Sequence, residues 1–300
     1  MLEGKGVKRT VFINFTDCGI KYMYNLKLGT SVSLFSQTDY RKEYVQDIKD
    51  IKKLGFYSVD LSLDNVGGYK HSMEKCSLSL NDALKAIVDS GLKLNGVHLP
   101  FGPFNNITSY DDGVRAFAVA EFVDMIGVCD AYKPDFYIFH SMAGSPIQGV
   151  REKRKQIIKS TFSKLVLATK ATVCMENMTN SGVPNTSLET IEIVDGVKGG
   201  KICFDTNHYL QEKPQDAILD LGQRIATLHV SDYNFVKEQH LMPMQGKIDW
   251  MQLIGALQQV KYNGVFNYEI AMSEYGYTYR QIKDNYLKLF DDFNRKSDRY

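Results

Sequence analysis

The chain has 300 residues, of which 44% are hydrophobic and 24% are charged, enough to bury a large core in one barrel or in two smaller domains. Its 36 basic and 35 acidic side chains leave a formal net charge of +1, so no overall field gathers nucleic acid or an anionic membrane. No apolar run reaches transmembrane length, and the odd, scattered set of 5 cysteines is typical of a reducing compartment, which predicts a cytoplasmic protein with no membrane partner.

Residues 1–26 have the least regular pattern of the chain. The apolar stretch after Lys8 and Arg9 is broken by Asn14, Thr16 and Asp17, too early for the apolar region of a secretory signal. The segment is compatible with an added strand or with a plug under a barrel, and its pattern does not decide between them. We predict one domain over residues 1–300, with 1–26 as an N-terminal extension.

From about residue 27 onward, short β-rich apolar runs alternate with longer stretches of helical period. Eight strands are expected, over residues 28–34, 57–61, 94–98, 136–140, 172–177, 201–205, 226–231 and 265–270. Helices are expected between them, for example over residues 40–54 and 150–169. This alternation is the pattern of repeated βα units and a parallel sheet, and it predicts an α/β fold, a single (β/α)8 TIM barrel without a linker.

Turn residues agree with this periodicity. Polar residues that cap helix N-termini are expected at the starts of three helices, at Ser79, Asp111 and Asp249. Glycines that follow helices and precede strands are expected to adopt a left-handed conformation, at Gly55, Gly91 and Gly264.

Six of the eight expected strands end in, or just past, a side chain that can bind a metal ion: His98, His140, Glu176, Asp205, His229 and Glu269. In a parallel barrel the carboxyl ends of the strands converge on one face, which brings such residues within a few ångströms of each other. Strand alternation also directs them inward, because each of the last four shares a face with a small or polar residue two positions earlier: Cys174, Cys203, Thr227 and Asn267.

Taken singly, a His or Glu after a strand is more often a hydrogen-bonded loop residue than a ligand. Taken together, two carboxylates directed into one cavity repel each other unless a cation lies between them. Histidine with Asp and Glu supplies the mixed nitrogen and oxygen ligands that Mn2+, Zn2+, Mg2+ or Co2+ accept. The sequence therefore predicts one divalent metal ion at this end of the barrel.

Several motifs resemble those of the sugar phosphate isomerase/epimerase superfamily, the xylose isomerase-like TIM barrels that include ketose 3-epimerases, hydroxypyruvate isomerases and inosose dehydratases. These motifs are Asp-Thr-Asn-His at 205–208, Leu-His-Val-Ser-Asp at 228–232, the stretch 240–250 and Asn-Tyr-Glu at 267–269. One departure is Pro-Met-Gln-Gly at 243–246, where many relatives carry Pro-Gly-Glu-Gly, which puts a sugar contact there in doubt.

The resemblance implies the role of each site residue. Metal ligands are implied at Glu176, Asp205, His229 and Glu269. Substrate contacts are implied at His208, with His98 and His140 lining the same mouth, and we include Phe104 and His240 among the candidate contacts. For His208, a role in holding Asp205 is an equal alternative. Phe101, Phe104 and Trp250 could form an apolar wall over the ligand, although ordinary packing is the more common role of each.

Such a site suits proton abstraction from a carbon next to a carbonyl, with the cation stabilising the charge of the enediolate. Glu176 and Glu269 are expected to serve as acid and base as well as ligands. Return of the proton to the same carbon epimerises the substrate, return to the neighbouring carbon isomerises it, and loss of a β-hydroxyl dehydrates it. The sequence leaves these outcomes open. The expected partner is a small carbohydrate, and the resemblance implies a homo-oligomer.

The main alternative is a trinuclear zinc phosphodiesterase like the apurinic endonucleases, because Glu238 and His240 complete a set of nine metal-binding residues. Against it, that family places Asp where Glu238 stands. Loops 98–106 and 232–240 also carry only one basic residue, Lys237, to meet phosphates, so no nucleic-acid partner is expected. A second alternative is a barrel that binds a metal or a sugar without catalysis.

Overall fold

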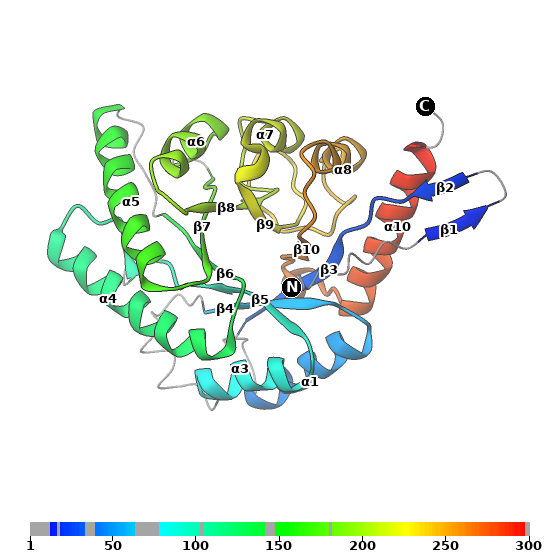
Figure 1. The fold of residues 1–300 in the computed structure, drawn as a ribbon, viewed down its shortest axis with the longest axis horizontal. Helices are drawn as coiled ribbons and strands as arrows, with labels where there is room; N and C mark the ends of the chain where they lie inside the picture. Colours follow the sequence, from blue (N-terminus) through cyan, green and yellow to red (C-terminus); the bar gives the residue numbers. More distant parts are fainter. Residues whose placement is uncertain are drawn as a thin grey trace, which may run out of the picture.

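Eight parallel strands form a barrel at the centre of the described part of the molecule (Figure 1). The computed structural model describes residues 13–16, 19–33, 40–63, 78–102, 105–141, 148–179 and 182–297. The barrel strands are β3 (Lys27–Ser33), β4 (Ser58–Ser62), β5 (Lys93–His98), β6 (Phe136–Phe139), β7 (Thr172–Glu176), β8 (Lys201–Asp205), β9 (Ile225–His229) and β10 (Val265–Tyr268). Each lies where a strand was expected, and they pair in the order β10-β3-β4-β5-β6-β7-β8-β9.

The first and last strands of that order meet through a short bridge. Val230, just after β9, pairs in parallel with Tyr268 of β10. The backbone N–H of Val230 donates to the carbonyl oxygen of Asn267 at 2.8 Å, and the N–H of Glu269 donates to the carbonyl oxygen of Val230 at 3.0 Å. These bonds nearly close the barrel, which confirms the predicted (β/α)8 architecture.

Helices connect the strands and surround the barrel in Figure 1. They are α1 (Tyr40–Lys53), α3 (Leu80–Asp89), α4 (Asp112–Cys129), α5 (Gln148–Ala168), α6 (Ser187–Asp195), α7 (Pro214–Leu221), α8 (Trp250–Gln259), α9 (Met272–Tyr275) and α10 (Tyr279–Ser297), with short 3-10 turns η2 (Asp130–Tyr132) and η3 (Gly222–Arg224). The expected helices over 40–54 and 150–169 correspond to α1 and α5. Among the described helices, none combines the length and apolar content needed to cross a bilayer.

The capping predictions hold at five of six positions. Ser79, Asp111 and Asp249 each accept a hydrogen bond from a backbone N–H in the first turn of α3, α4 and α8, respectively. Gly55 and Gly91 have φ values of +84° and +76°, as expected for left-handed residues.

The prediction for Gly264 is wrong, because the residue with positive φ after α8 is Lys261, at 59°. Gly264 is needed for a different reason. A Cβ there would lie 2.4 Å from the hydroxyl oxygen of Tyr262, so only a glycine allows that ring to approach the backbone.

The described part of the segment before the barrel contains two antiparallel strands, β1 (Ile13–Thr16) and β2 (Gly19–Tyr22), which pair as a hairpin in a sheet of their own. In Figure 1 the hairpin lies outside the barrel, so these two strands are neither an added barrel strand nor a plug, while residues 1–12 lie outside the described part of the chain. Tyr24 connects this segment to the rest of the chain. Its backbone N–H donates to Oδ1 of Asn294 at 3.0 Å, and its ring packs against Phe290 and Phe293 of α10.

Strand alternation separates two kinds of buried surface. The large outer core, between strands and helices, contains the outward-facing residues such as Val173, Met175 and Phe204. A small separate cluster inside the barrel contains Ile138, Cys174 and Cys203. Because Glu176 and Asp205 lie two residues after these cysteines, their side chains share the inner face, as the sequence predicted.

Candidate metal and active site

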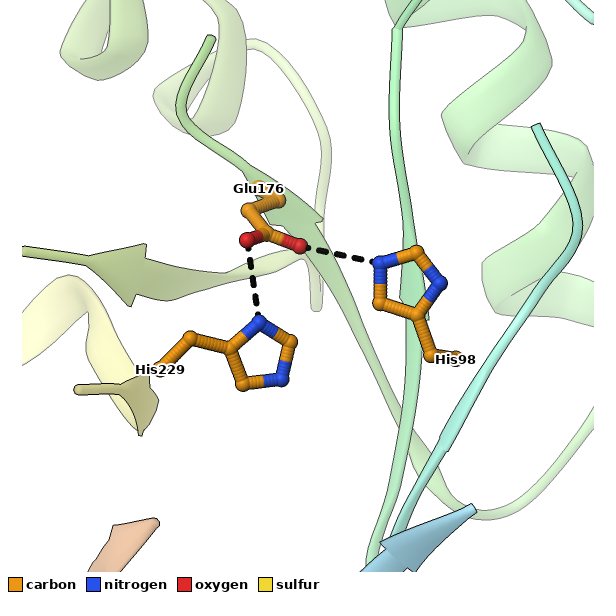
Figure 2. Close-up of side chains that lie close together, drawn as sticks. All are labelled: His98, Glu176 and His229. Atoms are coloured by element: carbon orange, nitrogen blue, oxygen red, sulfur yellow. Dashed lines mark hydrogen bonds and ion pairs between the residues drawn. The ribbon is translucent and has the colours of Figure 1, made fainter. Parts of the chain in front are cut away.

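Glu176, at the carboxyl end of β7, is the centre of the site. Its side chain is fully buried, and both of its oxygens lie within hydrogen-bond distance of histidine nitrogens (Figure 2). Oε1 lies 2.9 Å from Nδ1 of His229. Oε2 lies 3.1 Å from Nε2 of His98 and 2.9 Å from Nε2 of His140. Residues from four different strand ends therefore meet at one carboxylate.

The four residues predicted as metal ligands are Glu176, Asp205, His229 and Glu269, and the structure brings one ligand atom of each within 4.8 Å of the others. Nδ1 of His229 also lies 3.1 Å from Oε2 of Glu269, so two carboxylates face one imidazole nitrogen. Oδ2 of Asp205 is buried and has no hydrogen-bond partner within the described part of the chain. A buried acceptor without a partner, next to two crowded carboxylates, fits a divalent cation bound among these four side chains.

Two asparagines that sequence reasoning did not single out hold Asp205. Nδ2 of Asn177 donates to the carbonyl oxygen of Asp205 at 3.0 Å, and the N–H of Asp205 donates to Oδ1 of Asn177 at 2.7 Å. The backbone N–H of Asn207 donates to Oδ1 of Asp205 at 2.7 Å. These bonds leave Oδ2 as the free ligand atom. The only signal in the sequence was that each asparagine lies within two residues of a predicted ligand.

The electrostatics differ between the carboxylates. Burial alone would raise the pKa of Glu176, but the imidazoles of His229 and His140 outweigh it and hold the pKa well below its usual range. Burial is likewise outweighed at Glu269, where His229 lowers the pKa to about 2. At Asp205 burial dominates and raises the pKa to about 7. The two glutamates are therefore ionised at neutral pH and surrounded by hydrogen-bond donors.

A second group of possible ligands adjoins the first. Nε2 of His240 lies 2.8 Å from Oε1 of Glu238, and Nε2 of His208 lies 3.6 Å from the same oxygen. His208 is also close to the first group, since its Nε2 lies 3.5 Å from Oδ2 of Asp205. Its Nδ1 donates to the carbonyl oxygen of Asn177 at 2.7 Å, which orients the ring. His208 and His240 thus line the same mouth as the four predicted ligands.

The aromatic residues have different positions. Phe101 is 37% exposed, and its ring centroid lies 4.4 Å from that of His140, so it is placed at the mouth. Phe104 lies outside the described residues. Trp250 is buried, and its Nε1 donates to Oδ2 of Asp232 at 2.8 Å. Trp250 therefore packs under a loop and forms no wall over the site.

The chain is similar to several known proteins. The chain is 30% identical over 76 residues to the uncharacterised protein y4fM of Sinorhizobium fredii, which covers 25% of this chain and only 24% of that protein. It is 24% identical over 255 residues to the D-psicose 3-epimerase of Ruminiclostridium cellulolyticum, covering 80% of this chain and 82% of the relative.

Among solved structures, the IOLI protein with a zinc atom superposes with a TM-score of 0.68 at 15% identity, covering 90% of this chain and 99% of that chain. At this identity the likeness shows a shared fold. A family model described as xylose isomerase-like TIM barrel matches residues 48–288. Because that match includes all but the first of the barrel strands and every residue of the site, the chain belongs to the xylose isomerase-like TIM barrel family.

Proposed function

We propose that this chain is a divalent-metal-dependent isomerase or epimerase of a sugar or sugar phosphate. The observation that carries the proposal is the four-residue ligand group, whose atoms lie within 4.8 Å of one another at one end of the barrel. The D-psicose 3-epimerase relative, aligned over 80% of this chain, supports a ketose as the substrate class. The expectations of one domain, a homo-oligomer and a cytoplasmic location stay predictions.

Glu176, Asp205, His229 and Glu269 would hold a divalent ion, which would supply positive charge next to a substrate carbonyl that loses a neighbouring proton. The two glutamates differ in what they can do. Both oxygens of Glu176 already lie within 2.9 Å of histidine nitrogens, and its side chain is fully buried. The Glu269 side chain is 24% exposed, so it can reach a ligand in the mouth. We assign Glu269 to removing the proton, which it keeps. Glu176 would pass a proton to the substrate from the other side, taken from the imidazole of His140 that lies 2.9 Å from its Oε2.

His98, His140, His208 and His240 would surround the substrate in this proposal. Each places an imidazole at the mouth, and such rings hydrogen-bond hydroxyl groups of a sugar readily. Phe101 offers an apolar face beside His140. The same constellation could expel a β-hydroxyl, so a dehydratase of the inosose type remains compatible with the site.

One observation favours a second candidate function. His208, Glu238 and His240 form a further group that could hold a metal ion, as an apurinic endonuclease-like trinuclear phosphodiesterase would require. Elemental analysis of the purified chain separates the two functions. One ion per chain supports the isomerase and excludes the trinuclear phosphodiesterase, whereas three zinc ions would do the reverse.

Proton exchange tests the proposed reaction without a guess about its product. A panel of ketoses, their phosphates and short keto acids is incubated with the chain in deuterated water with Mn2+, and deuterium incorporation next to the carbonyl is followed by NMR. We expect exchange with at least one ketose, loss of exchange on adding a chelator, and loss in Glu269→Gln. Exchange that survives in Glu269→Gln, or no exchange with any compound, would contradict the proposal.

A further inference from the structure

Asp60 lies inside the barrel, in the middle of β4, and is not among the metal-binding candidates. Its side chain is 1% exposed. Its Oδ2 lies 3.5 Å from Nε2 of His229, on the side of the ring opposite the ligand group. Neither of these two atoms has a hydrogen-bond partner among the described residues. Because a buried polar atom without a partner is costly, the acceptor and the ring nitrogen each need the other.

The contacts of the other ring nitrogen, Nδ1, determine which atom of the pair formed by His229 and Asp60 carries the proton. Nδ1 faces the carboxylates of Glu176 and Glu269, at 2.9 and 3.1 Å, so Nδ1 is the atom that faces the proposed ion. A histidine ligand binds a metal through a nitrogen lone pair, and the neutral ring then carries its proton on the other nitrogen. For His229 that nitrogen is Nε2, which points at Asp60.

The surroundings of Asp60 fix the direction of its carboxylate. Nδ2 of Asn95 donates to Oδ1 at 2.6 Å, which leaves Oδ2 for His229. The pairing of β4 with β5 shifts register between Val59 and Asp60, and Asn95 is the extra residue that this shift places beside Asp60. A Cβ on Gly96 would lie only 2.8 Å from Oδ2, so glycine at this position leaves room for the carboxylate.

We infer that Asp60 is a positioning residue for the metal site: its carboxylate accepts the Nε2–H of His229 and so keeps Nδ1 available to the ion. The inference rests on the metal-binding part of the proposed function. Carboxylates behind histidine ligands fix the tautomer and the orientation of the ring, and their loss typically weakens metal binding by about 10- to 100-fold.

The substitution Asp60→Asn tests the tautomer directly, because it keeps the shape of the side chain. Asn95 continues to donate to the oxygen at the Oδ1 position, so the new amide group takes the place of Oδ2 and faces His229. The amide N–H at position 60 and the Nε2–H of His229 are both donors and cannot hydrogen-bond to each other, so the proton of His229 moves to Nδ1. There it occupies the lone pair that would bind the ion. We expect the affinity for Zn2+, measured by competition with a chromophoric chelator, to fall about 10- to 100-fold.

A double substitution separates this role from a merely structural one. In Asp60→Asn with Asn95→Asp, the new carboxylate at 95 accepts from the amide at 60, and the amide oxygen turns toward Nε2 of His229. The Zn2+ affinity should then recover most of its loss. Ser58→Ala is the matched control, because Ser58 lies on the same strand, is also buried and also lacks a partner within the described chain. That control should bind Zn2+ like the original chain.

Nitrogen-15 NMR of histidine-labelled, zinc-loaded protein reports the tautomer, and thermal melting in chelator checks that each variant folds. We expect a protonated Nε2 for His229 in the original chain and in the double variant. An Asp60→Asn variant with undiminished Zn2+ affinity would overturn the inference, as would a double variant no better than the single one. These measurements need no substrate, so a failed isomerase assay and a failed role for Asp60 remain distinguishable.

Discussion

The side chain of Asn177 makes hydrogen bonds to both backbone polar groups of Asp205, at 3.0 and 2.7 Å, and so joins the ends of β7 and β8. Asn177→Ala removes both bonds from fully buried groups. We expect the free energy of unfolding to fall by about 1–3 kcal/mol, and the affinity for a divalent ion to fall about tenfold or more, because Asp205 loses its fixed position. Urea denaturation and chelator competition measure the two effects.

Asn285→Ala is the control for this prediction. Asn285 also bridges two segments, since its Nδ2 donates to the carbonyl oxygen of Pro243 and its Oδ1 accepts from the hydroxyl of Tyr268, both at 2.8 Å. Its loss should lower stability without changing metal affinity. An equal loss of metal affinity in both variants would mean that Asn177 acts only through overall stability.

The loop after β9 depends on a glycine. The carboxylate of Asp232 accepts hydrogen bonds from the backbone N–H groups of Met244 and Ile248. A Cβ on Gly246 would lie 2.3 Å from Oδ1 of Asp232, so Gly246→Ala forces the loop to move. We expect Gly246→Ala to lower the free energy of unfolding by about 1–3 kcal/mol, measured by urea denaturation. At Gly255 the nearest atom to a new Cβ is 3.8 Å away, and Gly255→Ala in helix α8 should instead be neutral or stabilising. Equal losses in both variants would show that the close approach at Gly246 is unimportant.

An ion-pair group between α5 and α6 should make stability depend on pH. Hydrogen bonds from Lys155 and Lys159 outweigh the opposing effect of burial and lower the pKa of Glu192 below its usual 4.5. A carboxylate with a lowered pKa stabilises the fold above its unfolded pKa, and this contribution is lost as the pH falls through the folded value. Because Glu192 is 41% exposed, screening limits the effect.

Glu192→Gln should therefore be less stable than the original chain at pH 7, by no more than about 1 kcal/mol. The difference should narrow as the pH is lowered from 5 toward about 3, in the range where the unfolded and then the folded carboxylate take up protons. Urea denaturation of both proteins across this range measures it. If the difference in the free energy of unfolding instead widened toward acid pH, the proposed stabilisation by ionised Glu192 would be contradicted.

The strands of the barrel could be predicted from the sequence because burial on both faces gives short apolar runs bounded by turn residues. The inward direction of Glu176 and Asp205 followed from strand alternation alone. The hairpin before the barrel could not be predicted, because two short strands outside the main core have no hydrophobic pattern to fix their partner. The role of Gly264 depends on the ring of Tyr262, a contact that no turn preference encodes.

The residues that support the ligands were harder to find than the ligands. Asp60 lies between Val59 and Leu61 in an apolar strand. A charged residue within such a run is the one feature of the sequence that indicates a role for Asp60 inside the barrel. Its contact with His229 joins strands that are distant in sequence and depends on a register shift, which periodicity does not reveal. Trp250 takes the ordinary packing role that the sequence favoured over a binding wall, because its amphipathic ring can anchor a loop through Asp232.

The number of bound ions should depend on Asp205 and not on Glu238. Asp205 is fully buried and offers a carboxylate oxygen without a hydrogen-bond partner in the described chain, whereas the Glu238 side chain is 37% exposed and already contacts His240. We expect Asp205→Asn to lose its single divalent ion and Glu238→Gln to keep one ion per chain, both measured by elemental analysis after dialysis. If Glu238→Gln instead lowered the count from three ions, the group formed by His208, Glu238 and His240 would be a metal site in its own right, and the phosphodiesterase would become the better candidate.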